Sequence, residues 1–255
     1  MRNNQRDILY LHLHASERFV LSSGFEFYEF ALSAPEPLTN LLLLKHKYED
    51  GDFNMNTLLE YVTQESLPHL LKEDVHAYGD FCWIDFEDEI GLDELEGKEI
   101  ADLLYLGHCK THLQPPFFRK LNNQYVYLAH DDGWFNKIYY RSLDHYFYML
   151  GKLVPFKMDS LKIERTWLGI KKRNEYPDMP VETLMRLSHL MTEGMAVSFK
   201  HIQQTRNRME IPIWVVGDFF NMDDMMDRFE ENKSQLPDAK IIYQRKTKEW
   251  SIVLK

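Results

Sequence analysis

The chain of 255 residues carries 40 Asp and Glu against 30 Lys and Arg, so its formal net charge is −10. Residues 1–120 hold 10 basic and 22 acidic side chains, net −12, whereas residues 121–255 hold 20 and 18, net +2. This acidic excess disfavours broad contact with nucleic acid or an anionic membrane, because both bind clustered positive charge. The aromatic content is high, with 16 Phe, 14 Tyr and 5 Trp, which predicts an aromatic-rich core.

Membrane and redox signals are also informative. No apolar run approaches the roughly 20 residues that a transmembrane helix needs, and the first residues do not follow the pattern of a signal peptide. Cys82 and Cys109 are too few for a disulfide framework, and their spacing matches no zinc ribbon or CxxC motif. The sequence therefore predicts a cytoplasmic protein without a membrane span.

Hydrophobic periodicity and turn signals predict the elements in chain order. In the first half we expect strands at 7–14, 19–32 (as two short strands), 40–48, 57–62 and 75–86, and helices at 65–72 and 97–113. In the second half we expect a hairpin at 124–129 and 134–140, a helix at 143–153, a strand at 161–172, a helix at 181–193, strands at 195–199 and 211–216, a helix at 221–233 and a hairpin at 239–244 and 250–254.

Strands that follow one another directly favour antiparallel pairing over a wound parallel sheet. We therefore predict an α+β fold with a largely antiparallel sheet, a central β-hairpin and several packed helices. The prediction is a single compact unit over residues 1–255, with a candidate seam near 152–180. The central hairpin rests on Asp132-Gly133, because glycine tolerates the positive φ of a tight turn between two aromatic runs.

The tip of this hairpin holds the densest trio of functional groups, His130, Asp131 and Asp132. An imidazole and two carboxylates on a rigid turn can bind a divalent ion or act as acid and base, so these are the candidate catalytic residues. Asp and His also occur in turns for backbone reasons alone. Candidate ligand-binding residues are Trp134, Tyr140 and Asp85.

Two histidine pairs are weaker metal candidates. His12 and His14 alternate onto one face of the first strand, and Asp218 follows a later buried strand. His108 and His112 are four apart on a predicted helix, but the glutamate of a metalloprotease motif is missing because Cys109 follows His108. Each pair also has a structural explanation, in backbone hydrogen bonding or in the helix dipole. No cofactor is predicted, and a divalent metal is the alternative.

Nucleophile elbows, phosphate loops and dinucleotide fingerprints are absent from the sequence. A basic strip could contact RNA through Lys171, Lys172, Arg173, Arg206 and Arg208, but interspersed acidic residues favour a solvated loop.

Three segments carry a family resemblance: YGDFCWIDFED, YVYLAHDDGWFNKIYYR and IPIWVVGDF. Together they resemble an uncharacterised family of soluble proteins from Gram-positive, spore-forming bacteria, some of which carry the name oxalate:formate antiporter. The resemblance covers nearly the whole chain and implies no activity or catalytic residues. The transporter name conflicts with the sequence, since a transporter of that kind needs many membrane spans.

The leading functional hypothesis is a binding protein for a protein or small-molecule ligand, with an acidic N-terminal half and no expected nucleic-acid or membrane partner. Missing catalytic signatures favour a protein that is not an enzyme. The alternatives are a metal-dependent hydrolase or nuclease that uses the turn at His130, Asp131 and Asp132, and an RNA-associated protein.

Overall fold

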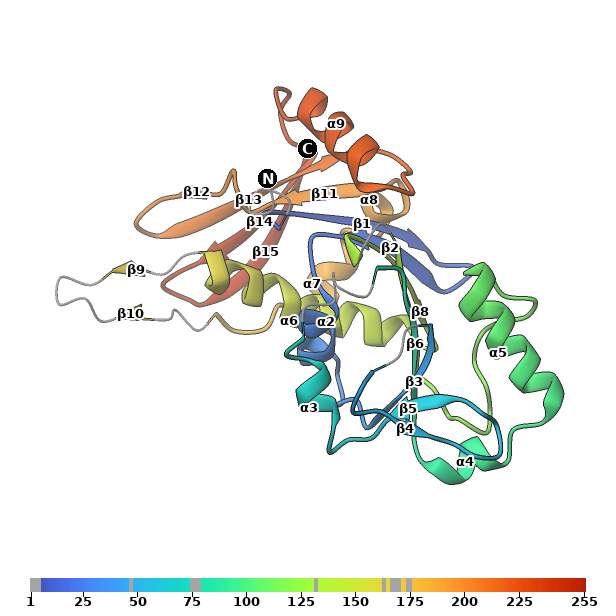
Figure 1. Cartoon of the computed structure of the whole chain (residues 1–255). Coiled ribbons are helices and arrows are strands. Elements are labelled where there is room, and N and C mark those ends of the chain that lie inside the picture. The colour runs from blue at the N-terminus through green and yellow to red at the C-terminus, as the bar shows by residue number, and fades with distance from the viewer. Residues whose placement is uncertain are drawn as a thin grey trace. The chain divides into compact units, whose positions relative to one another are not determined.

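The computed structural model describes residues 6–45, 48–73, 79–130, 133–161, 164–165, 171–172 and 176–255. The chain divides into two compact units, whose helices and strands are labelled in Figure 1. Unit one comprises Met1–Leu13, Ser23–Phe25 and Tyr146–Lys255, and unit two comprises His14–Ser22 and Glu26–His145. The seam predicted near 152–180 lies inside unit one.

The strands of unit one pair antiparallel in the order β15-β14-β13-β11-β1, with β12 beside β13. Their bounds are β1 (Ile8–His14, of which His14 counts with unit two), β11 (Met195–Ser198), β12 (Gln203–Gln204), β13 (Arg208–Val215), β14 (Ala239–Gln244) and β15 (Glu249–Leu254). A separate antiparallel pair is β9 (Glu164–Arg165) with β10 (Lys171–Lys172). The helices are α6 (Leu143–Leu161, in unit one from Tyr146), α7 (Val181–Met185), α8 (Ser188–Thr192) and α9 (Met222–Asn232).

Helix α9 shows why the sequence folds locally as predicted. The side chain of Asn221 accepts a hydrogen bond from the backbone N–H of Asp224 at 2.9 Å, which caps the helix start. Met222, Met225 and Phe229 recur on one face and are buried, and the Phe229 ring packs edge-on against Trp214 of β13, with centroids 5.6 Å apart. The predicted helix at 221–233 is therefore confirmed.

The strands of unit two lie in the order β2-β8-β7-β6-β3-β5-β4. Their bounds are β2 (Phe19–Ser23), β3 (Asn40–Lys45), β4 (Asp52–Phe53), β5 (Glu60–Val62), β6 (Cys82–Phe86), β7 (Tyr125–His130) and β8 (Phe135–Tyr140). The helices are α2 (Phe27–Ser33), α3 (Leu67–Leu70), α4 (Glu89–Asp93) and α5 (Gly97–Cys109). The predicted central hairpin is β7 with β8, whose register runs from Tyr125 opposite Tyr140 to His130 opposite Phe135.

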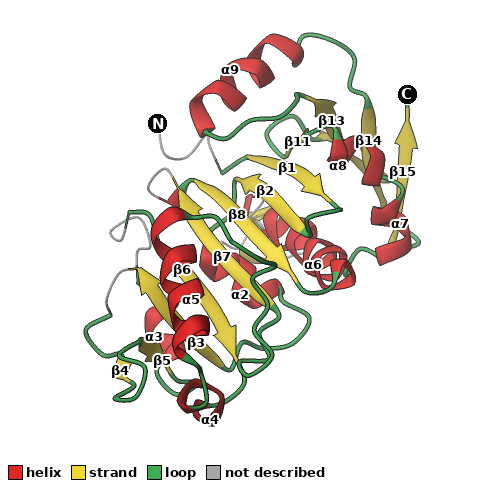
Figure 2. Cartoon of the chain, turned by 90° about the vertical axis from the view of Figure 1, so that its right-hand side faces the viewer, coloured by secondary structure: helices red, strands yellow, loops and turns green. Residues whose placement is uncertain are grey.

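Aromatic rings fill the space between α2 and one face of the unit-two sheet. Phe27 packs edge-on against Trp83 of β6 and Tyr127 of β7, with centroids 4.8 Å and 5.0 Å away. Phe30, one turn later on the same helix, contacts Tyr125 and Tyr127. Figure 2 shows α5 across the strands on the side of the sheet opposite to α2. The core of unit two is thus built on the predicted aromatic residues.

The α+β fold class is confirmed, and three predicted elements need correction. Residues 27–33, predicted as strand, form α2, because Glu26 and Glu29 make a capping box that outweighs the β propensity of the phenylalanines. Helix α5 ends at Cys109 rather than residue 113, since Lys110 takes the left-handed conformation with φ 52°. Helix α6 continues past Pro155 to Leu161.

Helices in the described part of the chain were also compared with the requirements of a bilayer. None of them combines the length and apolarity that a membrane span requires.

Replacing Phe27 with alanine tests the aromatic contact between α2 and the sheet. Phe27 is 1% exposed, so Phe27→Ala should lower the free energy of unfolding by about 3–5 kcal/mol through lost burial and a cavity. The matched control is Tyr28→Ala on the same helix, where the side chain is 42% exposed and the expected change is within about 0.5 kcal/mol. Urea unfolding of both variants would contradict this packing if the two changes were equal.

Candidate ligand-binding pocket

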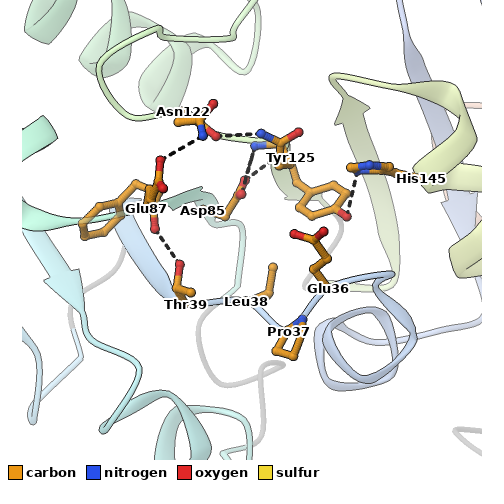
Figure 3. Close-up of a pocket in the computed structure, with 11 residues that line it drawn as sticks. Glu36, Pro37, Leu38, Thr39, Asp85, Glu87, Asn122, Tyr125 and His145 are labelled. Atoms are coloured by element: carbon orange, nitrogen blue, oxygen red, sulfur yellow. Dashed lines mark hydrogen bonds between the residues drawn. The ribbon is translucent and has the colours of Figure 1, made fainter.

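A pocket of about 450 Å³ opens on unit two beside the end of β6 (Figure 3). Three stretches of chain and one helix start supply its walls: the loop between α2 and β3, the end of β6, the turn before β7, and the first turn of α6. The lining residues are Glu36, Pro37, Leu38, Thr39, Asp85, Phe86, Glu87, Asn122, Gln124, Tyr125 and His145. All of them belong to unit two, so its own fold forms the pocket.

Asp85 lies at the centre of this pocket in Figure 3 and anchors the chain that enters β7. Its carboxylate accepts the backbone N–H of Gln124 at 2.9 and 3.0 Å and the N–H of Tyr125 at 2.6 Å. Burial raises the pKa of Asp85 to about 7, although these hydrogen bonds and the charge of Arg141 pull it down. The carboxyl group is therefore balanced between its charged and neutral forms near neutral pH.

Tyr125 and His145 form the opposite wall. The hydroxyl of Tyr125 lies 3.2 Å from Nδ1 of His145, within hydrogen-bonding distance. Burial raises the pKa of Tyr125, and the negative charges of Asp85 and Glu36 raise it further, so the phenol stays protonated at neutral pH. Tyr125 is thus a fixed hydrogen-bonding group whose ring edges pack on Phe30 and Tyr140.

The charge of the pocket is one-sided. Three carboxylates, Glu36, Asp85 and Glu87, are among the eleven lining residues, and none of the eleven is lysine or arginine. Glu36 and Glu87 are exposed at the rim, where Glu87 accepts a hydrogen bond from the side chain of Asn122 at 2.9 Å. Carboxylates in a concave surface with low-dielectric walls concentrate negative potential. The arrangement therefore suits a positively charged group.

The structure places only one of the predicted catalytic trio. His130 ends β7 and is half-buried, and its pKa is lowered to about 4 by burial and by Lys110, with Asp80 opposing. Asp131 and Asp132 lie outside the described residues. His130 does not line the pocket, and its catalytic role stays a prediction.

Of the three predicted ligand-binding residues, Asp85 lines the pocket and the other two lie elsewhere in unit two. Tyr140 is fully buried in β8, where its ring packs against Phe30 and Tyr125 behind the pocket wall. Trp134 is half-buried in the turn before β8. Their roles in ligand binding stay predictions.

The metal candidates separate into different environments. His108 is exposed near the end of α5, whereas His112 follows the helix and packs edge-on against Tyr139 at 5.2 Å. The predicted shared helical face is wrong, because the helix ends between these two residues. His12 lies in β1 with Nδ1 2.9 Å from Asp218, and the ring of His14 stacks on Phe19 at 4.2 Å. Of the basic strip, Arg208 pairs with Glu210, and Arg173 is outside the described residues.

Sequence patterns missed most of the pocket. Glu36 stands between two prolines that indicated only a break, and His145 is one polar residue in an aromatic helix. Tyr125 was assigned to the core by its strand pattern. The available signal was the carboxylate-rich stretch from Asp80 to Asp102, which indicated solvation or cation binding without indicating which residues share a cavity.

Protonation of Asp85 predicts a pH dependence of stability. The pKa of Asp85 rises from 3.8 to about 7 on folding, so between these values the unfolded chain releases a proton that the folded chain retains. Folding stability from this group is full below about pH 4 and falls as the pH rises towards 7. The difference in unfolding free energy between wild type and Asp85→Asn should therefore shrink or change sign across this range.

Urea unfolding at a series of pH values measures this difference. The matched control is Glu65→Gln, an exposed carboxylate of the same unit, which should follow wild type at every pH. A constant difference between wild type and Asp85→Asn from pH 4 to 7 would show that Asp85 titrates as an ordinary aspartate.

Comparisons with known proteins add no further constraint. No family model matches the chain, and no curated protein or solved structure is significantly similar to it. The family resemblance noted from the sequence stays a prediction, and the function is argued from the geometry of the pocket.

Proposed function

We propose that the protein is a binding protein whose unit-two pocket takes a small organic cation, such as a primary ammonium or a guanidinium group. The observation that carries the proposal is the lining itself, with three carboxylates and neither lysine nor arginine. A cation in the pocket replaces water as the partner of these carboxylates, in a place where solvent screens charge less than at an open surface.

The charge of the whole unit favours the same ligand class. Unit two holds 10 basic and 24 acidic residues, net −14, whereas unit one holds 20 and 16, net +4. The acidic excess of the chain therefore belongs entirely to the unit that contains the pocket. A negative field of this kind raises the local concentration of cations and speeds their association.

The two depths of the carboxylates suggest separate roles. Glu36 and Glu87 at the exposed rim attract a cation over a longer distance, and Asp85 at the buried end contacts it. Because a bound cation favours the ionised form of Asp85, whose pKa is raised to about 7, binding near neutral pH should release a proton. The ring of Tyr125 offers a further contact to the cation.

Binding is favoured over catalysis by the state of the polar groups. No serine or cysteine lines the pocket, and the hydroxyl of Thr39 donates to the backbone carbonyl of Phe86 at 2.9 Å. The Tyr125 hydroxyl is placed against His145, but burial raises its pKa and so disfavours the phenolate. A nucleophile with an adjacent base, which covalent catalysis needs, is thus not formed among the lining residues.

Isothermal titration calorimetry with n-butylamine and methylguanidine tests the proposal at neutral pH, with n-butanol as the neutral probe of similar length. Saturable binding of the cations, weaker at high salt and accompanied by proton release in buffers of different ionisation enthalpy, is expected. Equal binding of n-butanol, or no binding of either cation at low salt, would overturn the proposal.

Charge-neutralising variants locate the binding. Glu36→Gln and Glu87→Gln keep the side-chain shape, and each should weaken cation binding roughly fivefold by removing one nearby charge. Glu65→Gln removes the same charge from an exposed site of unit two that does not line the pocket, so its affinity should equal that of wild type. Three equal affinities would mean that the general charge of the unit attracts the ligand, without the pocket.

A further inference from the structure

A second polar centre lies in unit one, where a buried histidine meets an aspartate. His12 in β1 is 8% exposed at its side chain and Asp218, after β13, is 49% exposed. Nδ1 of His12 lies 2.9 Å from a carboxylate oxygen of Asp218, and Nε2 lies 3.2 Å from the backbone carbonyl of Thr192. Both imidazole nitrogens therefore face oxygen atoms.

The partner of Nε2 decides the protonation of the ring. A backbone carbonyl can only accept a hydrogen bond, so Nε2 must carry a hydrogen to contact Thr192. In a neutral imidazole Nδ1 then has a lone pair, and this lone pair faces the carboxylate of Asp218, which is also an acceptor. Two acceptors at 2.9 Å repel each other unless a positively charged species lies between or beside them.

The backbone holds Asp218 in this position. Gly194, which follows α8, approaches so closely that an added Cβ would lie 1.9 Å from the carbonyl oxygen of Gly217. The hydroxyl of Tyr10 donates to this same carbonyl at 2.9 Å and accepts the N–H of Phe219 at 3.1 Å. The residues on both sides of Asp218 are thus tied to β1, so the carboxylate is preorganised beside His12.

We propose that His12 Nδ1 and the carboxylate of Asp218 are two ligands of one divalent transition-metal ion in unit one. Metal–nitrogen and metal–oxygen bonds of about 2.1 Å that enclose an angle of about 90° leave the donor atoms about 3 Å apart. The observed separation of 2.9 Å matches this arrangement.

The donor set indicates the class of ion. Imidazole with carboxylate suits Zn²⁺, Mn²⁺ or Fe²⁺ rather than the soft ions that thiolates select, and the near-right angle favours an octahedral ion such as Mn²⁺. The carbonyl of Thr192 holds the imidazole in the tautomer that leaves Nδ1 available, as the second partner of a metal-bound histidine commonly does. Because Asp218 is half-exposed, water completes the coordination from the solvent side.

The competing explanation is a protonated histidine that forms an ion pair with Asp218 and binds no metal. Asp218→Asn separates the two. The asparagine amide can donate to the lone pair on Nδ1 of a neutral ring, so the variant keeps a hydrogen bond while losing the anionic ligand. The metal-free variant should therefore remain folded, with a melting temperature close to that of metal-free wild type.

The experiment titrates Mn²⁺ and Zn²⁺ into the full chain, purified without a histidine tag and stripped with a chelator, by calorimetry. Wild type should bind one ion, and His12→Ala and Asp218→Asn should each lose at least about 10-fold in affinity. Mn²⁺ should raise the melting temperature of wild type and leave that of Asp218→Asn unchanged. Circular dichroism verifies that each variant is folded.

The matched control is His189→Ala, which removes an exposed histidine whose Nε2 lies at the same 2.9 Å from Glu193. Its metal affinity should equal that of wild type. Absence of stoichiometric metal binding by wild type, or an unchanged affinity in Asp218→Asn, would overturn the proposal and leave the ion pair as the explanation. Because the two centres lie in different units, neither result depends on the pocket at Asp85.

Discussion

The hydrogen bonds between the Asp85 carboxylate and the backbone of Gln124 and Tyr125 determine how the chain enters the central hairpin. At that point β7 begins to pair with β6 and β8, and the entering N–H groups have to be satisfied as water is excluded. A single carboxylate with two acceptor oxygens satisfies both residues. The position of Tyr125, and with it one wall of the pocket, follows from this contact.

Two opposing effects act on the same carboxyl group. Burial disfavours its charge, while backbone N–H donors and Arg141 favour it, and the resulting pKa of about 7 leaves both forms accessible. An aspartate that only anchored a turn would be fully served by the ionised state. The lining of the pocket explains why this balance matters, since Glu36 and Glu87 add negative charge that only a cation or a proton can offset.

Local signals in the sequence were sufficient for much of the fold. The Asp-Gly turn, the Asn221 cap and the alternation of β1 each depend on a few adjacent residues, and each prediction is confirmed. The segment 27–33 was missed because its phenylalanines have strand propensity, and the capping box of Glu26 and Glu29 was not weighed against it. Local preference is decisive only where two local signals agree.

The sites could be predicted only in part, for a reason that lies in the chain topology. Glu36, Asp85 and His145 come from three separate stretches, and the antiparallel pairing of unit two brings them to one cavity. His12 and Asp218 were each noted from the sequence, one in an HxH pair and one at a strand end, but their contact depends on β11, which lies between β1 and β13.

Both centres share a physical logic that is visible only in three dimensions. In each, a side chain is fixed by backbone groups: Asp85 by two N–H donors, and His12 by the carbonyl of Thr192. Fixing one acceptor or donor in this way commits the remaining atoms of the side chain to a defined direction. In unit two the committed direction is an acidic cavity, and in unit one it is the carboxylate of Asp218, so each unit presents unmatched negative or lone-pair character. A positively charged ligand resolves that mismatch in both cases, an organic cation where the cavity is wide and a metal ion where the donors are 2.9 Å apart.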